Sequence, residues 1–311
     1  MRSTACSSNS CRPDGIRPSP VVSVADAMLL TTIRRARREL ADHGPRRTRA
    51  AGDFACVALP ESDCDALRDL LIAEQVRVVV EIGLAYGSSA LAIGEALVSL
   101  GAPEAKHLII DAYQARFQDT GWEAIAAAGL ATLCTLLKER SQLALPRLVS
   151  EDMVADTAFV DGSHVFHNVF VDLYFLRELV RPGGLIVLDD CQWPSVLTAV
   201  RYFEVNAGWQ QQPIDGPTRL RSFRLPRPRV EPSFEAFRPF WNSSRARLGR
   251  PCDLMVRIGR DRIGEQFTLC QLITCLQSSP SPTSRRHGSG TRYSLGAPKI
   301  TTRWTHWLSG E

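Results

Sequence analysis

The stretch that decides the fold of this chain is Val-Val-Val-Glu-Ile-Gly-Leu-Ala-Tyr-Gly-Ser-Ser at residues 78–89. Three valines followed by alternating apolar residues are typical of a strand that is covered on both faces. The apolar residues of segment 90–100 then recur at helical spacing. Between these two segments, Gly83 and Gly87 allow the backbone to come close to a ligand. The stretch therefore predicts a buried strand, a glycine turn and a helix, which together form a cradle for a nucleoside-type cofactor.

The spacing of the acidic residue and the glycines separates two kinds of nucleotide site. Glu81, Gly83 and Gly87 give Glu-x-Gly-x-x-x-Gly, whereas the dinucleotide fingerprint needs a second glycine two residues after the first. Ser88 or Ser89 can cap the following helix and leave its N–H groups facing the ligand. The pattern by itself is also compatible with a purely structural tight turn. Other segments of the chain are needed to distinguish this interpretation from a cofactor site.

Four further segments predict strands that end in polar or acidic side chains. These segments are residues 106–111, 134–142, 158–164 and 184–190. In open α/β sheets, ligands bind at the carboxyl ends of the strands. Five consecutive strands with polar ends therefore predict one shared site, a pattern that core packing alone does not produce.

Three consecutive segments carry a resemblance to a known family. They read Phe-Val-Asp-Gly-Ser-His at 159–164, Val-Phe-Val-Asp-Leu at 169–173 and Arg-Pro-Gly-Gly-Leu-Ile-Val-Leu-Asp-Asp at 181–190. With the order of the predicted strands, they resemble the class I S-adenosylmethionine-dependent methyltransferases, in particular the metal-dependent O-methyltransferase branch that includes the catechol and macrolide-sugar enzymes. The resemblance covers about residues 60–225. It implies an α/β fold: a doubly wound, mostly parallel, seven-stranded Rossmann-like sheet with helices on both faces and an antiparallel last strand.

The resemblance also implies S-adenosylmethionine as the cofactor and gives the strand ends their roles. Glu81 would lie near the ammonium group of the cofactor. Asp111 would accept hydrogen bonds from both ribose hydroxyls, since an ionised carboxylate only accepts. Ser141 and Gln142 stand where relatives contact the adenine. The remaining implied cofactor contacts are Gly83, Ala85, Tyr86, Gly87, Ser88 and Asp161.

Two of these residues also have a purely structural interpretation. Asp111 could be a turn residue at the end of its strand. Ser141 could be the N-cap of the short apolar helix that runs to Leu148, and this role is compatible with a contact to the adenine.

Asp161, Asp189 and Asp190 predict a metal site. Asp161 ends one strand and the acidic pair ends the next, so their oxygens would reach a common point if those strands are neighbours. Unpaired carboxylates that face one another repel, and a divalent cation removes this cost. Oxygen ligands suit magnesium and also accept manganese or calcium. The competing interpretation is that Asp189 or Asp190 merely caps the helix that begins near Pro194.

The candidate general base is His164, which acts with Asp161, three residues before it. His164 stands where the catechol-type relatives carry a catalytic lysine, and the metal of those relatives holds the substrate hydroxyls and lowers their pKa. An imidazole titrates near neutrality and can take a proton from a hydroxyl. The competing role of His164 is to cap the helix that starts here. His167 is expected on the face of that helix.

The remaining segments predict scaffold. Apolar residues at steps of three and four indicate a helix over 165–180, with Asn168, Asp172 and Arg177 away from its core-facing stripe. Pro182-Gly183-Gly184 is expected to stop that helix and turn the chain into the next strand. Further helices are expected over 61–74 and 195–206, and an edge strand over 219–225.

Composition divides the chain of 311 residues into a central domain and two terminal segments. We expect residues 1–27 to be disordered, 28–60 to form a basic helical segment, 61–241 to form the methyltransferase domain, and 242–311 to be a disordered, low-complexity tail. The net charge is +4, but residues 61–242 contain 16 basic and 24 acidic residues. An acidic domain argues against a broad nucleic-acid footprint, so no nucleic-acid partner is expected.

The cluster Arg34-Arg35-Ala36-Arg37-Arg38 lies on a predicted helix. A basic helix can contact a membrane surface or RNA. More often such a run is a solvated face or a cap near a substrate entrance, and we favour that interpretation.

Cysteine usage and hydropathy favour a soluble, cytoplasmic protein. The chain has nine cysteines, an odd number, and no Cys-x-x-Cys pair. It has neither a charged-then-apolar leader nor a run of 18 apolar residues, so no membrane span is expected. Assembly into a homo-oligomer is left open.

The sequence therefore predicts an enzyme that transfers a methyl group from S-adenosylmethionine to a hydroxyl of a small molecule, with Mg²⁺ or another divalent cation assisting. A second candidate is a metal-independent methyltransferase that acts on another acceptor, such as nitrogen or RNA. Enzymes that methylate the amines of bases carry Asp or Asn-Pro-Pro-aromatic after the fourth strand, and segment 161–164, Asp-Gly-Ser-His, lacks it. An NAD-binding oxidoreductase and a non-catalytic binding module are two further candidates.

Overall fold

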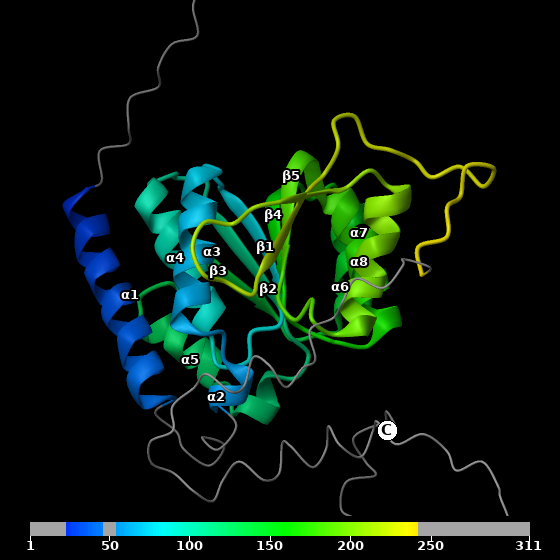
Figure 1. Ribbon diagram of the computed structural model, residues 1–311. Coiled ribbons are helices and arrows are strands. Elements are labelled where there is room, and N and C mark those ends of the chain that lie inside the picture. Colours follow the sequence, from blue (N-terminus) through cyan, green and yellow to red (C-terminus); the bar gives the residue numbers. More distant parts are fainter. Residues whose placement is uncertain (1–22, 46–53, 242–311) are drawn as a thin grey trace, which may run out of the picture. The chain divides into compact units, whose positions relative to one another are not determined.

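A computed structural model describes residues 23–45 and 54–241 of the chain (Figure 1). The expected tail over 242–311 and most of the expected N-terminal disorder lie outside these residues. Helix α1 (Val24–His43) begins before Met28, where the basic helical segment was expected to start. Ser23 explains the earlier start, because its hydroxyl accepts from the backbone N–H of Asp26 and the Asp26 carboxylate accepts from the backbone N–H of Ser23. Residues 24–27 are therefore helical, which corrects the prediction for them.

The described residues contain one seven-stranded sheet with the order β3-β2-β1-β4-β5-β7-β6. Strands β1 to β5 are parallel, whereas β7 is antiparallel to both β5 and β6. The order runs in opposite directions on the two sides of β1 and β4, as in a doubly wound sheet. The fold class expected from the resemblance is confirmed. The strands are β1 (Val78–Ile82), β2 (Lys106–Ile110), β3 (Cys134–Leu137), β4 (Ala155–Val160), β5 (Val180–Leu188), β6 (Gln210–Gln212) and β7 (Arg221–Arg224).

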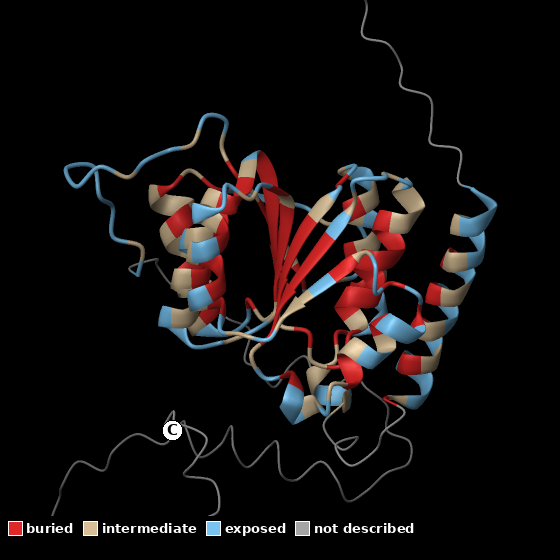
Figure 2. Ribbon diagram, turned by 180° about the vertical axis from the view of Figure 1, so that it is seen from behind, coloured by how far each residue is buried: buried red, intermediate tan, exposed pale blue. Residues whose placement is uncertain are grey.

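Helices cover both faces of the sheet. Figure 1 shows α1, α3, α4 and α5 on one side and α6, α7 and α8 on the other. Figure 2 shows the central strands buried between these layers. The helices are α2 (Phe54–Val57), α3 (Glu61–Ala73), α4 (Ser88–Leu100), the 3-10 helix η1 (Gln114–Phe117), α5 (Thr120–Ala127), α6 (Ser141–Ser150), α7 (Phe166–Leu179) and α8 (Pro194–Asn206).

Successive side chains of β1 belong to the cores on opposite faces of the sheet. Val79 packs with Leu67 of α3 and Ile93 of α4, whereas the next residue, Val80, packs with Leu173 of α7 in the opposite cluster. Successive side chains of a strand point to opposite faces, so this division follows from the run of valines. Both faces of β1 are buried, as expected from its sequence.

Three expectations about the later elements are corrected, and one strand was not expected. Helix α7 ends at Leu179, and Pro182-Gly183-Gly184 lies inside β5 instead of ending the helix. Strand β7 is not an edge strand, because β6 pairs with its outer side. Strand β6 was not predicted, since Gln210–Gln212 shows no apolar alternation. Asp172 and Arg177 of α7 are buried and not on a solvated face.

The basic cluster of α1 attaches this helix to the domain. Arg37 is 9% exposed and donates to both Glu95 of α4 and Asp65 of α3, while Arg34 Nε donates to Glu95 Oε1 at 2.8 Å. Arg35 and Arg38 are exposed. The interpretation as a solvated face is therefore wrong for Arg37, whose charge is used inside the protein. Within residues 23–45 and 54–241, no helix is long and apolar enough to cross a membrane.

We expect Glu95→Ala to lower the free energy of unfolding by about 3 kcal/mol, because it leaves the buried guanidinium of Arg37 with one carboxylate fewer. Urea denaturation measures this change. Glu151→Ala is the matched control, since the Glu151–Arg147 pair is exposed and should contribute less than about 0.5 kcal/mol. Equal effects of the two substitutions would contradict a role of Glu95 in attaching α1.

Candidate active site

The carboxyl ends of the parallel strands meet at one edge of the sheet. In the register, Ile82 lies opposite both Ile110 and Val160, and Val160 lies opposite Leu188. The residue that follows each strand end is therefore held beside its neighbours. Backbone hydrogen bonds continue the ladder by one step, from Gly83 N to Ile110 O, Asp111 N to Leu137 O, Asp161 N to Ile82 O and Asp189 N to Val160 O, at 2.9–3.1 Å.

The turn after β1 depends on its two glycines. Gly83 has φ +94°, and a Cβ at this position would overlap the carbonyl oxygen of Asp161. Gly87 has φ +88° and donates its N–H to Leu84 O at 2.7 Å. Gly87 itself is the N-cap of α4, so Ser88 and Ser89 do not cap the helix as predicted. The turn leaves the N–H groups of the first turn of α4 without partners inside the helix.

The structure does not bring the carboxylate of Glu81 to this edge. Glu81 is fully buried, where Oε1 accepts from the hydroxyl of Ser89 at 2.5 Å and Oε2 lies 2.8 Å from Nε2 of His107. Burial by itself lowers the pKa of His107, but hydrogen bonds to Cys134 and Glu81 outweigh it and raise the pKa to about 9. Glu81 shares the strand face of Val79, which α3 and α4 cover, so alternation along β1 was a signal for this position.

Tyr86 is another predicted contact whose side chain is used elsewhere. Its ring is buried and makes edge contacts with Phe54 and Phe117, with centroids 5.3 and 5.1 Å away. These contacts fasten α2 and η1 to the glycine turn. Tyr86 can therefore offer a ligand its backbone, as can Ala85, which has φ +43°.

Asp111 ties the glycine turn to the end of β2. Its Oδ2 accepts from the backbone N–H groups of Leu84 and Ala85 at 3.1 and 3.2 Å and from Gln114 Nε2 at 2.9 Å. Its Oδ1 accepts from Tyr113 N at 2.7 Å. A carboxylate has about four acceptor positions, so most of its capacity is engaged. The Oε1 atom of Gln114 is buried beside it and accepts from none of the described residues.

Ser141 and Gln142 lie at the first turn of α6, where a carboxylate from α7 meets them. Arg140 is the N-cap of this helix, so the capping role of Ser141 is wrong. Gln142 Nε2 donates to Ser141 Oγ at 3.0 Å and to Asp172 Oδ1 at 3.2 Å. Asp172 is 1% exposed, and burial raises its pKa to about 7 although the bonds to Ser141 and Gln142 oppose this. Its position three residues after Val169 and four before Leu176 was a signal for burial.

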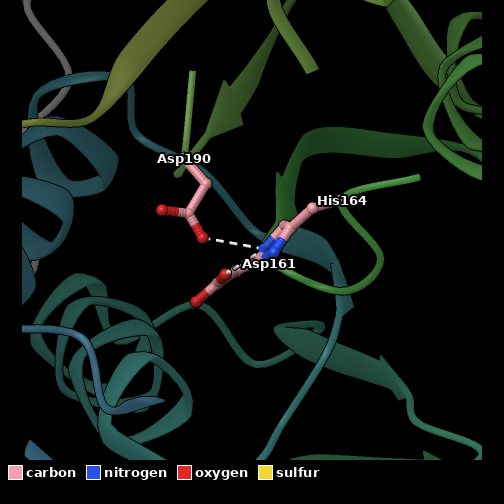
Figure 3. A group of neighbouring side chains, drawn as sticks. All are labelled: Asp161, His164 and Asp190. Atoms are coloured by element: carbon pink, nitrogen blue, oxygen red, sulfur yellow. Dashed lines mark ion pairs between the residues drawn. The ribbon is translucent and has the colours of Figure 1, made fainter. Parts of the chain in front are cut away.

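Asp161, His164 and Asp190 form a compact cluster at the ends of β4 and β5 (Figure 3). His164 Nε2 lies 2.7 Å from Asp190 Oδ2 and 3.9 Å from Asp161 Oδ1. The three ligand atoms, one from each residue, all lie within 4.8 Å of one another, so the cluster could hold one metal ion. Two carboxylates and an imidazole are a common donor set for divalent cations.

The charges of this cluster shift one another's proton affinity. Burial raises the pKa of Asp161 to about 6, with repulsion from Asp189 and Asp190 adding to the shift. The neighbouring carboxylates of Asp161 and Asp190 raise the pKa of His164 to about 10. Burial raises the pKa of Asp190, but the interaction with His164 outweighs burial, so the pKa of Asp190 is lowered from its ordinary value. At neutral pH, His164 is therefore an imidazolium held between carboxylates.

Asp189 is separate from the cluster, although it was predicted as a metal ligand. Its side chain is fully buried in a forked ion pair with Arg219, whose Nε donates to Oδ1 at 2.8 Å and whose terminal nitrogen donates to Oδ2 at 2.5 Å. Asp189 Oδ1 also accepts from the backbone N–H of Asp190. The guanidinium neutralises this carboxylate, so His164 takes its place in the candidate metal set. Arg219 precedes β7, although the alternation of polar and apolar residues predicted that the strand begins at this residue. The alternation gave no sign that its side chain pairs with Asp189.

The capping roles considered for these residues are wrong. The N-caps of α7 and α8 are Val165 and Trp193. His164 contributes its carbonyl, which accepts from Ser195 Oγ, and Asp190 contributes its carbonyl to Trp193 N. The side chains of His164 and Asp190 thus stay available for chemistry. His167 is an exposed residue of α7, as expected.

Residues 80–191 match a family model described as a methyltransferase domain. This segment runs from within β1 to the residue after the Asp189–Asp190 pair and so includes the glycine turn and all five strand ends. This segment is therefore similar to a methyltransferase domain, which supports the recognition of the class I methyltransferases from sequence.

A search among curated proteins found no match. Solved structures with a similar arrangement include the O-methyltransferase TomG from Streptomyces achromogenes, solved with SAM, at 23% identity. The match covers 63% of this chain and 88% of TomG, with a TM-score of 0.45. An O-methyltransferase from Bacillus cereus, solved with SAH, is 16% identical. Here 68% of this chain and 98% of the Bacillus chain are covered, with a TM-score of 0.48.

We expect Gly83→Ala to destabilise the fold by about 2 kcal/mol or more, because the added methyl group meets the Asp161 carbonyl in addition to the strain of a positive φ. Gly216→Ala separates the two effects, since Gly216 has φ +86° but open space around it. That control should lose only about 1 kcal/mol. Urea denaturation compares the two variants, and equal losses would show that the contact between the β1 and β4 ends is loose.

Proposed function

We propose that this protein transfers the methyl group of S-adenosylmethionine to a hydroxyl of a small molecule. The observation that carries the proposal is the juxtaposition of the glycine turn, Asp111 and the cluster of Asp161, His164 and Asp190 at one edge of the sheet. When bound, S-adenosylmethionine supplies an electrophilic methyl group. A nucleoside cradle beside groups that hold and exchange protons is what transfer to a hydroxyl requires.

The glycine turn and the end of β2 fit a nucleoside with a charged tail. Gly83, Ala85, Gly87 and Ser88 offer backbone groups on a turn that allows close approach. Asp111 lies at the end of the neighbouring strand, as expected of a ribose contact, and Gln114 Oε1 beside it is a further acceptor. The proposed role of Glu81 changes: it supports α4 through Ser89 and does not itself meet the ammonium group.

At the acceptor side, His164 remains the proposed general base, with Asp161 as its partner. Asp190 holds Nε2 of His164 at 2.7 Å and favours the protonated ring. His164 can therefore act as a base only when that carboxylate is displaced and the ring has lost its proton. Asp161 is more accessible to a hydroxyl, because its closest oxygen is 3.9 Å from the imidazole and is therefore less engaged. The two residues together can hold a substrate hydroxyl and receive its proton.

Asp161, His164 and Asp190 would hold the divalent cation. Such a cation supplies Lewis acidity, which lowers the pKa of a bound hydroxyl. Carboxylate oxygens suit Mg²⁺, and the imidazole widens the choice to Mn²⁺ or Zn²⁺. The same Nε2 atom of His164 cannot be both a metal ligand and the base. If no metal binds, the ion pair of His164 and Asp190 carries the chemistry alone, which corresponds to a metal-independent methyltransferase.

The four described cysteines, Cys56, Cys64, Cys134 and Cys191, are free thiols. Because disulfides are rare where thiols are kept reduced, these support the cytoplasm as the proposed compartment.

Titration calorimetry with S-adenosylhomocysteine and with NAD tests the cofactor. We expect binding of the former alone, and Asp111→Ala should weaken it by roughly 1.5–3 kcal/mol for each charge-assisted hydrogen bond that is lost. Asp111 also ties Leu84 and Ala85, so the loss includes disorder of the turn. Asp215→Ala, at an exposed carboxylate, is the control and should bind as wild type. Binding of NAD in place of the nucleoside would refute the methyltransferase proposal.

Release of S-adenosylhomocysteine in the presence of small phenols and sugar derivatives tests the acceptor side. Asp190→Asn should reduce turnover roughly 100-fold, because it removes the charge that holds His164, and should spare cofactor affinity. A chelator should abolish the wild-type activity, and Mg²⁺ should restore it. Full activity with the chelator would eliminate the metal and leave the ion pair of His164 and Asp190. Loss of cofactor binding in Asp190→Asn would show that Asp190 belongs to the nucleoside site.

A further inference from the structure

Asp172 is a buried carboxylate that the proposed chemistry does not use. It is 1% exposed on α7, and none of the ion pairs among the described residues includes it. Burying a carboxylate without a cation is costly unless hydrogen bonds compensate. Its hydrogen-bond donor among the described residues is Nε2 of Gln142, which also donates to Ser141 Oγ. Ser141 and Gln142 stand at the first turn of α6, where the resemblance to the class I methyltransferases places the adenine of the proposed cofactor.

The hydrogen bonds of this group fix which way the amide of Gln142 faces. A carboxylate only accepts, so Asp172 requires the NH₂ group of Gln142 on its side. Gln142 Nε2 has two protons, and its two acceptors are Asp172 Oδ1 at 3.2 Å and Ser141 Oγ at 3.0 Å. Ser141 is compatible with this orientation, because its Oγ accepts the second proton of the amide. The Oε1 atom of Gln142 is then the group left for a ligand, and it is an acceptor.

An acceptor at this position discriminates between purine bases. Adenine carries an exocyclic amine, which donates, whereas hypoxanthine carries a carbonyl oxygen at the same position, which accepts. If hypoxanthine were bound, its carbonyl oxygen would face Gln142 Oε1, and neither acceptor would have a hydrogen-bond donor. Sites that recognise a ligand through hydrogen bonds strongly reject ligands that leave such groups unpaired.

We infer that Asp172 is a positioning residue for base specificity: by fixing the amide of Gln142, it makes the site accept adenosyl and reject inosyl cofactors. The inference rests on the proposed function, because it takes the nucleoside to lie at the α6 terminus. Asp172 itself does not touch the base.

Calorimetry at pH 8.5 with S-adenosylhomocysteine and S-inosylhomocysteine tests the inference. This pH lies above the raised pKa of Asp172, about 7, so the side chain is a carboxylate in the experiment. We expect wild type to bind the adenosyl ligand at least tenfold more tightly than the inosyl ligand. Asp172→Asn can present either a donor or an acceptor, so Gln142 can reverse and the preference should fall to about threefold or less. Gln142→Leu, at a partly exposed position, should lose the preference as well.

Glu178→Gln is the matched control, because it makes the same change of charge on α7 at a residue paired with Arg177 and Arg229, away from α6. It should keep the wild-type preference. A general loss of packing would weaken both ligands equally, whereas the positioning role changes their ratio. A full preference in folded Asp172→Asn, or no preference in wild type, would overturn the inference while leaving the cofactor assignment intact. Failure of wild type to bind either ligand would overturn both.

Discussion

The parallel register of β1 to β5 is the constraint on which the rest of the structure depends. Because Ile82, Ile110, Val160 and Leu188 lie in one row, the residues that follow them are adjacent without any further device. The contact between Gly83 and the carbonyl of Asp161 makes this row tight, since a side chain at Gly83 would separate the two strand ends. The backbone ladder thus decides where the functional groups meet, and the side chains decide only what they can do there.

Four carboxylates around this row are compensated in four different ways. Glu81 pairs with His107 inside the sheet, Asp189 with the guanidinium of Arg219, Asp190 with His164, and Asp172 with neutral donors. Of these four groupings, the pair of Asp190 and His164 has both side chains partly exposed, so it is the one that a substrate can reach and exchange. The remaining carboxylates hold their surroundings in place. This difference in exposure separates the reactive charges from the supporting ones.

Much of the fold could be predicted from sequence, because β1 to β5 and the helices between them carry strong apolar periods. Strand β6 could not, since three glutamines contain no such period. The meeting of Asp161, His164 and Asp190 followed from their places at strand ends. The pairing of Asp189 could not be foreseen, because Arg219 comes from a connection whose path only tertiary contacts determine. The predicted positions of two carboxylates were wrong although the sequence carried a signal for their burial. For Glu81 the signal was the alternation along β1, and for Asp172 it was the helical spacing along α7.

Arg219 links more than one layer of the protein. Its backbone N–H donates to Asp63 of α3 at 3.1 Å, while its side chain compensates Asp189 at the end of β5. The connection between β6 and β7 is therefore anchored at its C-terminal end, unlike most surface loops. A deletion next to Arg219 would withdraw the guanidinium from a buried anion, so this end of the connection has little freedom to vary with the methyl acceptor.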